Sequence, residues 1–221
     1  MTARKLGLSP KEYRIALTKL RERIRVVESQ MSANKWEEIE FSEVPSKAMM
    51  NYRDAFERHQ PERFNMYMQS LAGEDTKINA RALFPYEILE KAELRAEYSN
   101  SYYSYYFKIN DDAVLEAQWK ALPNYVEEPA NFLVMADTSA SMTGRPMATS
   151  ISLAIYFAER NRGAFHNQFM TFSREPQFVE LKGNSLKEKI SCIKSIVDNT
   201  NLEKAFREIL EVAVANKVPP E

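Results

Sequence analysis

The sequence has little cysteine, little glycine and no long apolar run. It contains 1 cysteine and 5 glycines in 221 residues. One cysteine excludes an internal disulfide framework, and the N-terminus lacks the apolar core of a signal peptide, so we expect a cytoplasmic location. Sparse glycine, against a typical share of about 7%, favours helices over a turn-rich β fold. No apolar run approaches the roughly 20 residues that cross a bilayer, so we expect a soluble protein with no membrane partner.

A dominant charge and the common catalytic motifs are also missing. The 30 basic and 31 acidic side chains are interspersed and sum to a net charge of -1. No field of the whole protein therefore selects a nucleic acid, any polyanion site must be local, and we expect no DNA partner. The sequence has no phosphate-binding glycine loop, no Gly-x-Ser-x-Gly elbow and no paired-histidine zinc motif. We therefore predict that the protein is not an enzyme.

Residues 1–125 carry helical patterns. Ser9-Pro10-Lys11-Glu12 is typical of a helix start, with serine as N-cap, proline at the first helical position and glutamate closing a capping box. This helix is expected to run from Pro10 to about Gln30, and the later segments open with Ser, Pro or Asp. We expect an all-helical module, and stacking as a repeat solenoid stays open because no sequence period requires it. The further helices are expected at 46–58, 61–71, 85–98 and 111–121.

The helix that is expected to begin at Pro10 is amphipathic, with apolar residues on one side and cations on the other. A basic helical face contacts phosphates without reading sequence, and its affinity falls steeply with salt. Structured RNA is therefore a candidate partner, and a solvated outer face is the alternative. The apolar side carries Tyr13, Leu17, Leu20, Ile24 and Val27, and the basic side carries Lys11, Arg14, Lys19, Arg21, Arg23 and Arg25.

Residues 130–221 change to an α/β pattern. Proline, asparagine and glutamate interrupt the helical pattern at 123–129, where we place the domain boundary. The nearly continuous apolar run 131–136 predicts a strand buried on both faces of a parallel sheet. A helix from Pro146 to about Arg160 and a strand at 166–173 complete a βαβ unit. The fold class is therefore predicted as α/β, with a short antiparallel edge strand at 177–181 and helices at 185–197 and 201–215.

Polar side chains follow the first predicted strand of this part. The loop 137–141 offers one carboxylate and two hydroxyls at the carboxyl edge of the sheet, where α/β folds bind ligands. Thr200, just ahead of the last predicted helix, offers another hydroxyl at the same edge. Hard divalent cations take about six oxygen ligands, often with several waters. We therefore predict a Mg²⁺ or Mn²⁺ site at Asp137, Ser139, Ser141 and Thr200, with a position open for a partner's carboxylate; a helix-capping loop is the alternative.

The arrangement resembles the metal-ion-dependent adhesion site of von Willebrand A-type (vWA) domains. Their pattern is Asp-x-Ser-x-Ser, then a threonine in a Thr-Asn-like turn, then an aspartate after a later strand. Asp137, Ser139, Ser141 and Thr200 match the first two parts, and the chain ends where the third should begin. The resemblance implies the N-terminal half of a doubly wound vWA domain with an incomplete metal site. Three explanations fit this ending: a truncated sequence, an artificial boundary, or a site completed by another chain. We expect truncation, because half a sheet exposes an unpaired strand edge.

Three other stretches resemble the DUF2828 family. They are Ala82-Leu83-Phe84-Pro85-Tyr86, Glu116-Ala117-Gln118-Trp119-Lys120-Ala121-Leu122-Pro123 and Tyr156-Phe157-Ala158-Glu159-Arg160-Asn161. DUF2828 proteins look like relatives of the Ro/TROVE group, in which a ring of helical repeats carries a vWA domain and binds structured or misfolded RNA. The resemblance implies that residues 1–125 are the C-terminal part of a TROVE-like module.

Three functional hypotheses follow. The first is a Ro-like binding protein that engages RNA through its helices and a carboxylate-bearing protein through the metal. The second is a protein-binding scaffold without RNA, in which the basic helix only packs against other parts of the protein. The third is a fragment without autonomous function, because both domains are expected to be cut.

Overall fold

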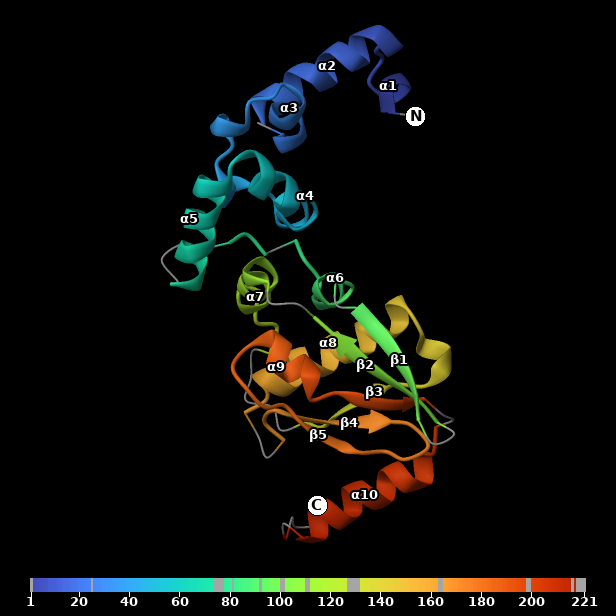
Figure 1. The fold of residues 1–221 in the computed structure, drawn as a ribbon. Helices are drawn as coiled ribbons and strands as arrows, with labels where there is room; N and C mark the ends of the chain where they lie inside the picture. The colour runs from blue at the N-terminus through green and yellow to red at the C-terminus, as the bar shows by residue number, and fades with distance from the viewer. Residues whose placement is uncertain are drawn as a thin grey trace. The chain divides into compact units, whose positions relative to one another are not determined.

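The computed structural model describes residues 2–24, 26–73, 78–80, 82–91, 93–99, 102–109, 112–126, 132–162, 165–197, 200–215 and 217. The chain divides into two compact units, Met1–Asn79 and Ala80–Glu221. It is an α/β protein in which N-terminal helices precede a mixed sheet, as predicted (Figure 1). None of the described helices is long and apolar enough to cross a membrane.

The described elements of the first unit are helices. The predicted capping box opens α2, with Ser9 accepting a hydrogen bond from the Glu12 backbone and Glu12 accepting one from the Ser9 backbone. The helix ends earlier than expected, at its C-cap Ile24, and a new helix begins at Val27. Clustered β-branched residues disfavour a continuous helix there. The elements are α1 (Thr2–Lys5), α2 (Pro10–Arg23), α3 (Val27–Ser32), η1 (Trp36–Glu38), η2 (Phe41–Glu43), α4 (Ser46–His59) and α5 (Pro61–Ala72).

An aromatic cluster forms the core of this unit. Phe56 of α4 is fully buried, and its ring centroid lies 5.3 Å from that of Phe41 and 6.0 Å from that of Phe64. The guanidinium of Arg63 donates hydrogen bonds to the backbone carbonyls of Trp36, Glu37 and Ile39 and lies over the Phe41 ring. The aromatic rings thus join α4 and α5 to the irregular segment before them.

Tyr67 belongs to the same core and yields a pH-dependent prediction. Its buried hydroxyl has no hydrogen-bond partner among the described residues, and burial, aided by the negative charge of Glu40, raises its pKa to about 12. An unfolded tyrosine ionises near pH 10, so between about pH 10 and 12 the unfolded state holds fewer protons and stability falls as pH rises. We expect Tyr67→Phe to remove most of this loss while changing stability little at neutral pH.

The measurement is the free energy of unfolding at neutral pH and at about pH 11, compared between wild type and variant. Tyr125→Phe is the matched control, because Tyr125 is largely exposed, and it should keep the alkaline loss. Equal alkaline sensitivity of the Tyr67→Phe variant and wild type would contradict the assignment.

The second unit contains the predicted βαβ unit. β3 and β4 pair in parallel through the crossover helix α8, and β5 pairs antiparallel at the edge of β4, as expected. Figure 1 shows α8 and α10 on opposite sides of this sheet. The buried face of α8 is mostly apolar. In contrast, α10 buries Ala205 and exposes several large apolar residues. The elements are α6 (Pro85–Leu89), β1 (Glu93–Ser99), β2 (Tyr102–Lys108), α7 (Ala113–Lys120), β3 (Val134–Asp137), η3 (Ala140–Met142), α8 (Arg145–Arg160), β4 (Gln168–Phe172), β5 (Phe178–Glu180), α9 (Leu186–Ser191), β6 (Lys194–Val197) and α10 (Leu202–Ala215).

A second sheet corrects two of the predicted helices. The helix expected at 85–98 stops at Leu89, and β1 pairs with β2 from Glu93↔Lys108 to Ser99↔Tyr102. The helix expected at 185–197 stops at Ser191 and gives way to β6, which pairs antiparallel with β2. The tyrosine-rich sequence of β2 strongly favours a strand, and pairing with it overrides the local helical preference of its partners. Residues 1–125 are therefore not all helical.

A partly buried charge cluster joins three helices of this unit. Both carboxylate oxygens of Glu159 accept from the Trp119 indole, at 3.3 and 3.0 Å. Glu159 also forms salt bridges with Lys189 at 2.8 Å and with Arg160 at 3.4 Å. Two of the stretches that resemble DUF2828, 116–123 and 156–161, thus meet at Glu159, where they stabilise the packing of α7, α8 and α9.

Candidate metal centre

The predicted metal-binding loop follows the end of β3. Asp137 is the last residue of this strand, and its Oδ1 accepts a hydrogen bond of 2.9 Å from the Ser139 backbone. The Ser139 and Ser141 hydroxyl oxygens lie 3.0 Å apart. Gly144 then turns the chain into α8 with φ of 88°, a conformation that residues with a Cβ rarely adopt. The loop is thus shaped so that its two serine hydroxyls lie side by side.

Backbone hydrogen bonds bring two other segments to this edge of the sheet. The Thr138 N–H donates to the carbonyl of Phe172, the last residue of β4. The next residue, Ser173, accepts at its carbonyl a bond of 3.1 Å from Asn201. Thr200 directly precedes Asn201 and is exposed. Asp137, the two serines and Thr200 therefore lie at the same carboxyl edge, as the sequence predicts.

The position of α10 at this edge is fixed by residues that sequence analysis did not single out. The Asn201 side chain caps the helix by accepting from the Lys204 backbone at 3.0 Å. The Lys204 ammonium pairs with Glu175 in the loop after β4. The Ser173 hydroxyl donates to the Glu175 carbonyl at 2.8 Å. Sequence analysis could have singled out Ser173 only because it ends a predicted strand. No spacing rule predicts the pairing of Glu175 with Lys204.

The two serine hydroxyls hydrogen-bond to each other, and their separation is also compatible with a magnesium-sized cation. Octahedral Mg²⁺ holds oxygens at about 2.0–2.1 Å, which places adjacent ligands about 2.9 Å apart, and the two serine hydroxyls are separated by 3.0 Å. Among the described residues, no group of three or more histidine, cysteine, aspartate or glutamate side chains is placed to hold a metal. Among the four proposed ligands, Asp137 alone is a carboxylate, so a cation here would take its other ligands from hydroxyls, water and a partner.

The predicted RNA-binding residues lie apart from the metal loop in sequence and belong to the first unit. Lys11, Arg14, Lys19, Arg21 and Arg23 are all exposed on α2. No residue of this helix is buried. Arg25 lies outside the described residues.

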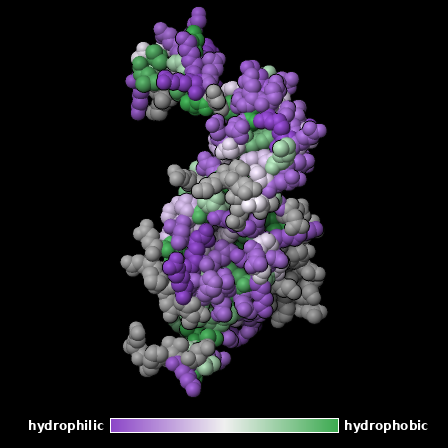
Figure 2. Space-filling view, turned by 90° about the vertical axis from the view of Figure 1, so that its left-hand side faces the viewer, coloured by the Kyte–Doolittle hydropathy of each residue, from purple (hydrophilic) through white to green (hydrophobic). Residues whose placement is uncertain are grey.

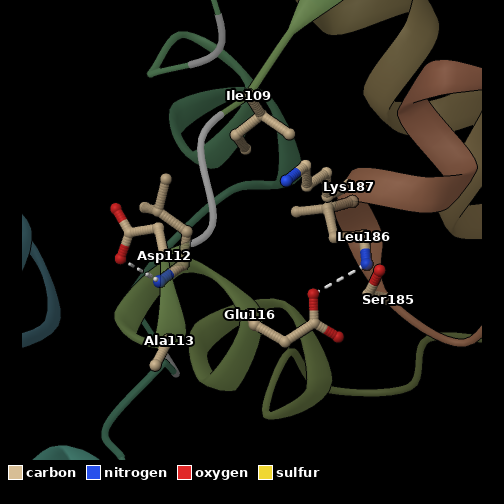
Figure 3. Close-up of a pocket in the computed structure, with 8 residues that line it drawn as sticks. Ile109, Asp112, Ala113, Glu116, Ser185, Leu186 and Lys187 are labelled. Carbon is tan, nitrogen blue, oxygen red and sulfur yellow. Dashed lines mark hydrogen bonds between the residues drawn. The ribbon is translucent and has the colours of Figure 1, made fainter.

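A pocket elsewhere in the second unit does not involve the predicted site. It has a volume of 350 Å³ and lies between α7 and α9, with Ile109, Leu115 and Leu186 among its apolar lining. Figure 3 shows the Glu116 carboxylate accepting from the Leu186 backbone across this pocket, at 2.7 Å. Asp112 caps α7 by accepting from its first backbone N–H groups. Its carboxylates therefore stabilise helix starts, and we assign the pocket no function.

Comparison with known proteins identifies the family. Residues 7–131 match the model of a domain of unknown function, DUF2828, and residues 131–221 match another, DUF7788. The models meet next to the predicted domain boundary, whereas the compact units divide between Asn79 and Ala80. Uncharacterized protein L728 of Acanthamoeba polyphaga mimivirus is 30% identical over 97% of this chain, which spans 38% of that relative. No solved structure matches the chain. The chain belongs to the DUF2828 family.

Proposed function

We propose that the protein is a non-enzymatic binding protein that holds Mg²⁺ or Mn²⁺ at Asp137, Ser139, Ser141 and Thr200 and captures a carboxylate of a partner protein. The observation that carries the proposal is the paired serine hydroxyls, 3.0 Å apart beside a strand-terminal aspartate. The vWA resemblance of the loop supports the same function. We place this activity in the cytoplasm, consistent with the single cysteine of the chain.

The ligand set determines what the metal would bind. One carboxylate leaves a divalent ion with a net positive charge, and four protein oxygens leave about two of its six positions to water or to a ligand. A partner's aspartate or glutamate is the preferred ligand, because it supplies both a hard oxygen and the compensating charge. Capture of an acidic side chain follows from this chemistry without any bond being broken.

Paramagnetic broadening tests the proposal directly. With Mn²⁺ added to the full chain, we expect the acetyl methyl resonance of N-acetylglutamate α-methylamide to broaden, and broadening to disappear with excess chelator. N-acetylglutamine α-methylamide is the matched probe, since it has nearly the same shape and carries no carboxylate, and it should broaden far less. Equal broadening of the two probes, or equal broadening with an Asp137→Asn variant, would refute carboxylate capture at this site.

RNA binding by α2 is the second candidate function. Its supporting observation is the set of five exposed cations on this helix. Contacts to phosphates would make RNA affinity fall steeply with salt, whereas binding that survives high salt and is lost with chelator favours the scaffold without RNA.

A further inference from the structure

The helix α2 exposes an apolar face as well as its cations. Leu20 is 52% exposed and Ile24 is 62% exposed. The half-buried residues Tyr13 and Leu17 extend the same side of the helix at spacings of three and four. We call these four residues the α2 stripe. Figure 2 shows hydrophobic residues at the surface of the N-terminal helices, next to hydrophilic ones. The exposed end of the α2 stripe, Leu20 and Ile24, is therefore available to an apolar surface.

The exposed residues of the α2 stripe, Leu20 and Ile24, do not line the groove beside α2. Thr18, Arg21 and Glu22 line this groove of 1410 Å³ together with residues of α3 and η1. Leu20 and Ile24 each follow one of these groove residues by two positions, which is about 200° around a helix. Leu20 and Ile24 therefore face away from Thr18 and Glu22, and the groove reaches the edge of the α2 stripe at Arg21.

Arginines flank the α2 stripe on both edges. By helical position, Arg14 and Arg21 lie along one edge and Arg23 lies along the other. The acidic residues of α2 lie in its first turn and in the groove. Glu12 forms the capping box with Ser9, whose hydrogen bonds lower the pKa of Glu12 and keep it ionised, and Glu22 lines the groove with Arg21. An apolar stripe between cations is complementary to a surface that is apolar inside and anionic at its rim.

We propose that α2 docks on the surface of an anionic phospholipid membrane, parallel to its plane. The α2 stripe enters the boundary between headgroups and acyl chains, while the flanking arginines extend to the lipid phosphates. RNA would pair with the arginines but would leave the α2 stripe in water, so exposure of the stripe favours lipid. The sequence predicts no membrane partner because it contains no run long enough to cross a bilayer. A helix that lies in the membrane interface needs no such run.

Vesicle co-sedimentation of the full chain tests the stripe. We expect binding to phosphatidylcholine vesicles with about 30% phosphatidylserine and much weaker binding to phosphatidylcholine alone. The double variant Leu20→Ser/Ile24→Ser should lower partitioning by at least about tenfold, because it removes two large apolar groups from the bilayer boundary. Ile15→Ser is the matched control, since Ile15 is 48% exposed but precedes Ile24 by about two and a half turns and lies on the opposite side. Circular dichroism checks that all variants keep their helices.

Variants of the flanking arginines distinguish lipid binding from RNA binding. Arg14→Gln/Arg21→Gln should lower partitioning to anionic vesicles by roughly 25-fold, about fivefold for each cation near the surface. Three outcomes would overturn the proposal: no binding to anionic vesicles, equal loss in the Ile15→Ser control and the stripe variant, or binding to polyuridylate alone that depends on the arginines and not on the stripe. The last outcome assigns α2 to RNA.

Discussion

Replacing Asp137 with asparagine is expected to abolish Mg²⁺ binding and to leave the fold intact. The amide oxygen of asparagine can still accept the hydrogen bond that Asp137 Oδ1 receives from Ser139 at 2.9 Å, so the turn after β3 is kept. The negative charge that a divalent cation requires is lost. Since changes to residues that merely support a metal ligand weaken binding about 10–100-fold, loss of the one carboxylate among the four proposed ligands should cost at least about 100-fold.

Calorimetric titration of Mg²⁺ and Mn²⁺ into wild type and variant is the measurement. Asp54→Asn is the matched control, because the Asp54 side chain is 81% exposed on α4 and has no part in the site. If wild type binds neither ion while the variant keeps full stability, the loop is a helix-capping structure and the metal proposal fails. If Asp137→Asn unfolds the protein, Ser139→Ala provides the second test, because it removes one proposed ligand without changing the charge of the loop.

Truncation of Phe56 to alanine is expected to cause a large loss of stability in the first unit. Phe56 is fully buried, and its ring meets those of Trp36, Phe41 and Phe64. Removing a buried phenylalanine loses its transfer free energy and leaves a cavity, together about 3–5 kcal/mol. Edge-to-face contacts with neighbouring rings place the expected loss toward the upper end of that range.

Urea denaturation followed by circular dichroism measures this loss. Met66→Ala is the control, because Met66 is 70% exposed on α5 and should change the free energy of unfolding by less than about 0.5 kcal/mol. A loss below about 1 kcal/mol in Phe56→Ala would mean that the aromatic cluster collapses around the vacancy and does not carry the stability of this unit.

The part of the fold that positions the candidate site could be predicted from sequence because its signals are local. The apolar run 131–136 that overlaps β3, the polar loop that begins at Asp137 and the helical period of α8 each fit in one short window. The parallel pairing of β3 with β4 then follows from the handed crossover of a βαβ unit. These three features were enough to place Asp137 and the two serines at the edge where Asn201 meets β4.

The hairpin and β6 could not be predicted because their strands are stabilised by distant partners. Residues 90–98 are rich in Glu, Leu and Ala, which favour a helix in isolation. Their conformation depends on pairing with Tyr102–Lys108 and, through it, with Lys194–Val197. Likewise, the ion pair between Glu175 and Lys204 joins segments whose proximity is set by the whole sheet. A short stretch of sequence does not reveal contacts between segments that are far apart in the chain.

The aromatic core and the Glu159 cluster also give the protein two native optical reporters. The chain has two tryptophans, and one falls in each compact unit: Trp36 stacks on His59 at 3.9 Å in the first, and the Trp119 indole donates to Glu159 in the second. Fluorescence of Trp36→Phe and Trp119→Phe variants would therefore follow the unfolding of each unit separately. Coincident midpoints would show that the units unfold as one cooperative body, and separated midpoints would give each unit its own stability.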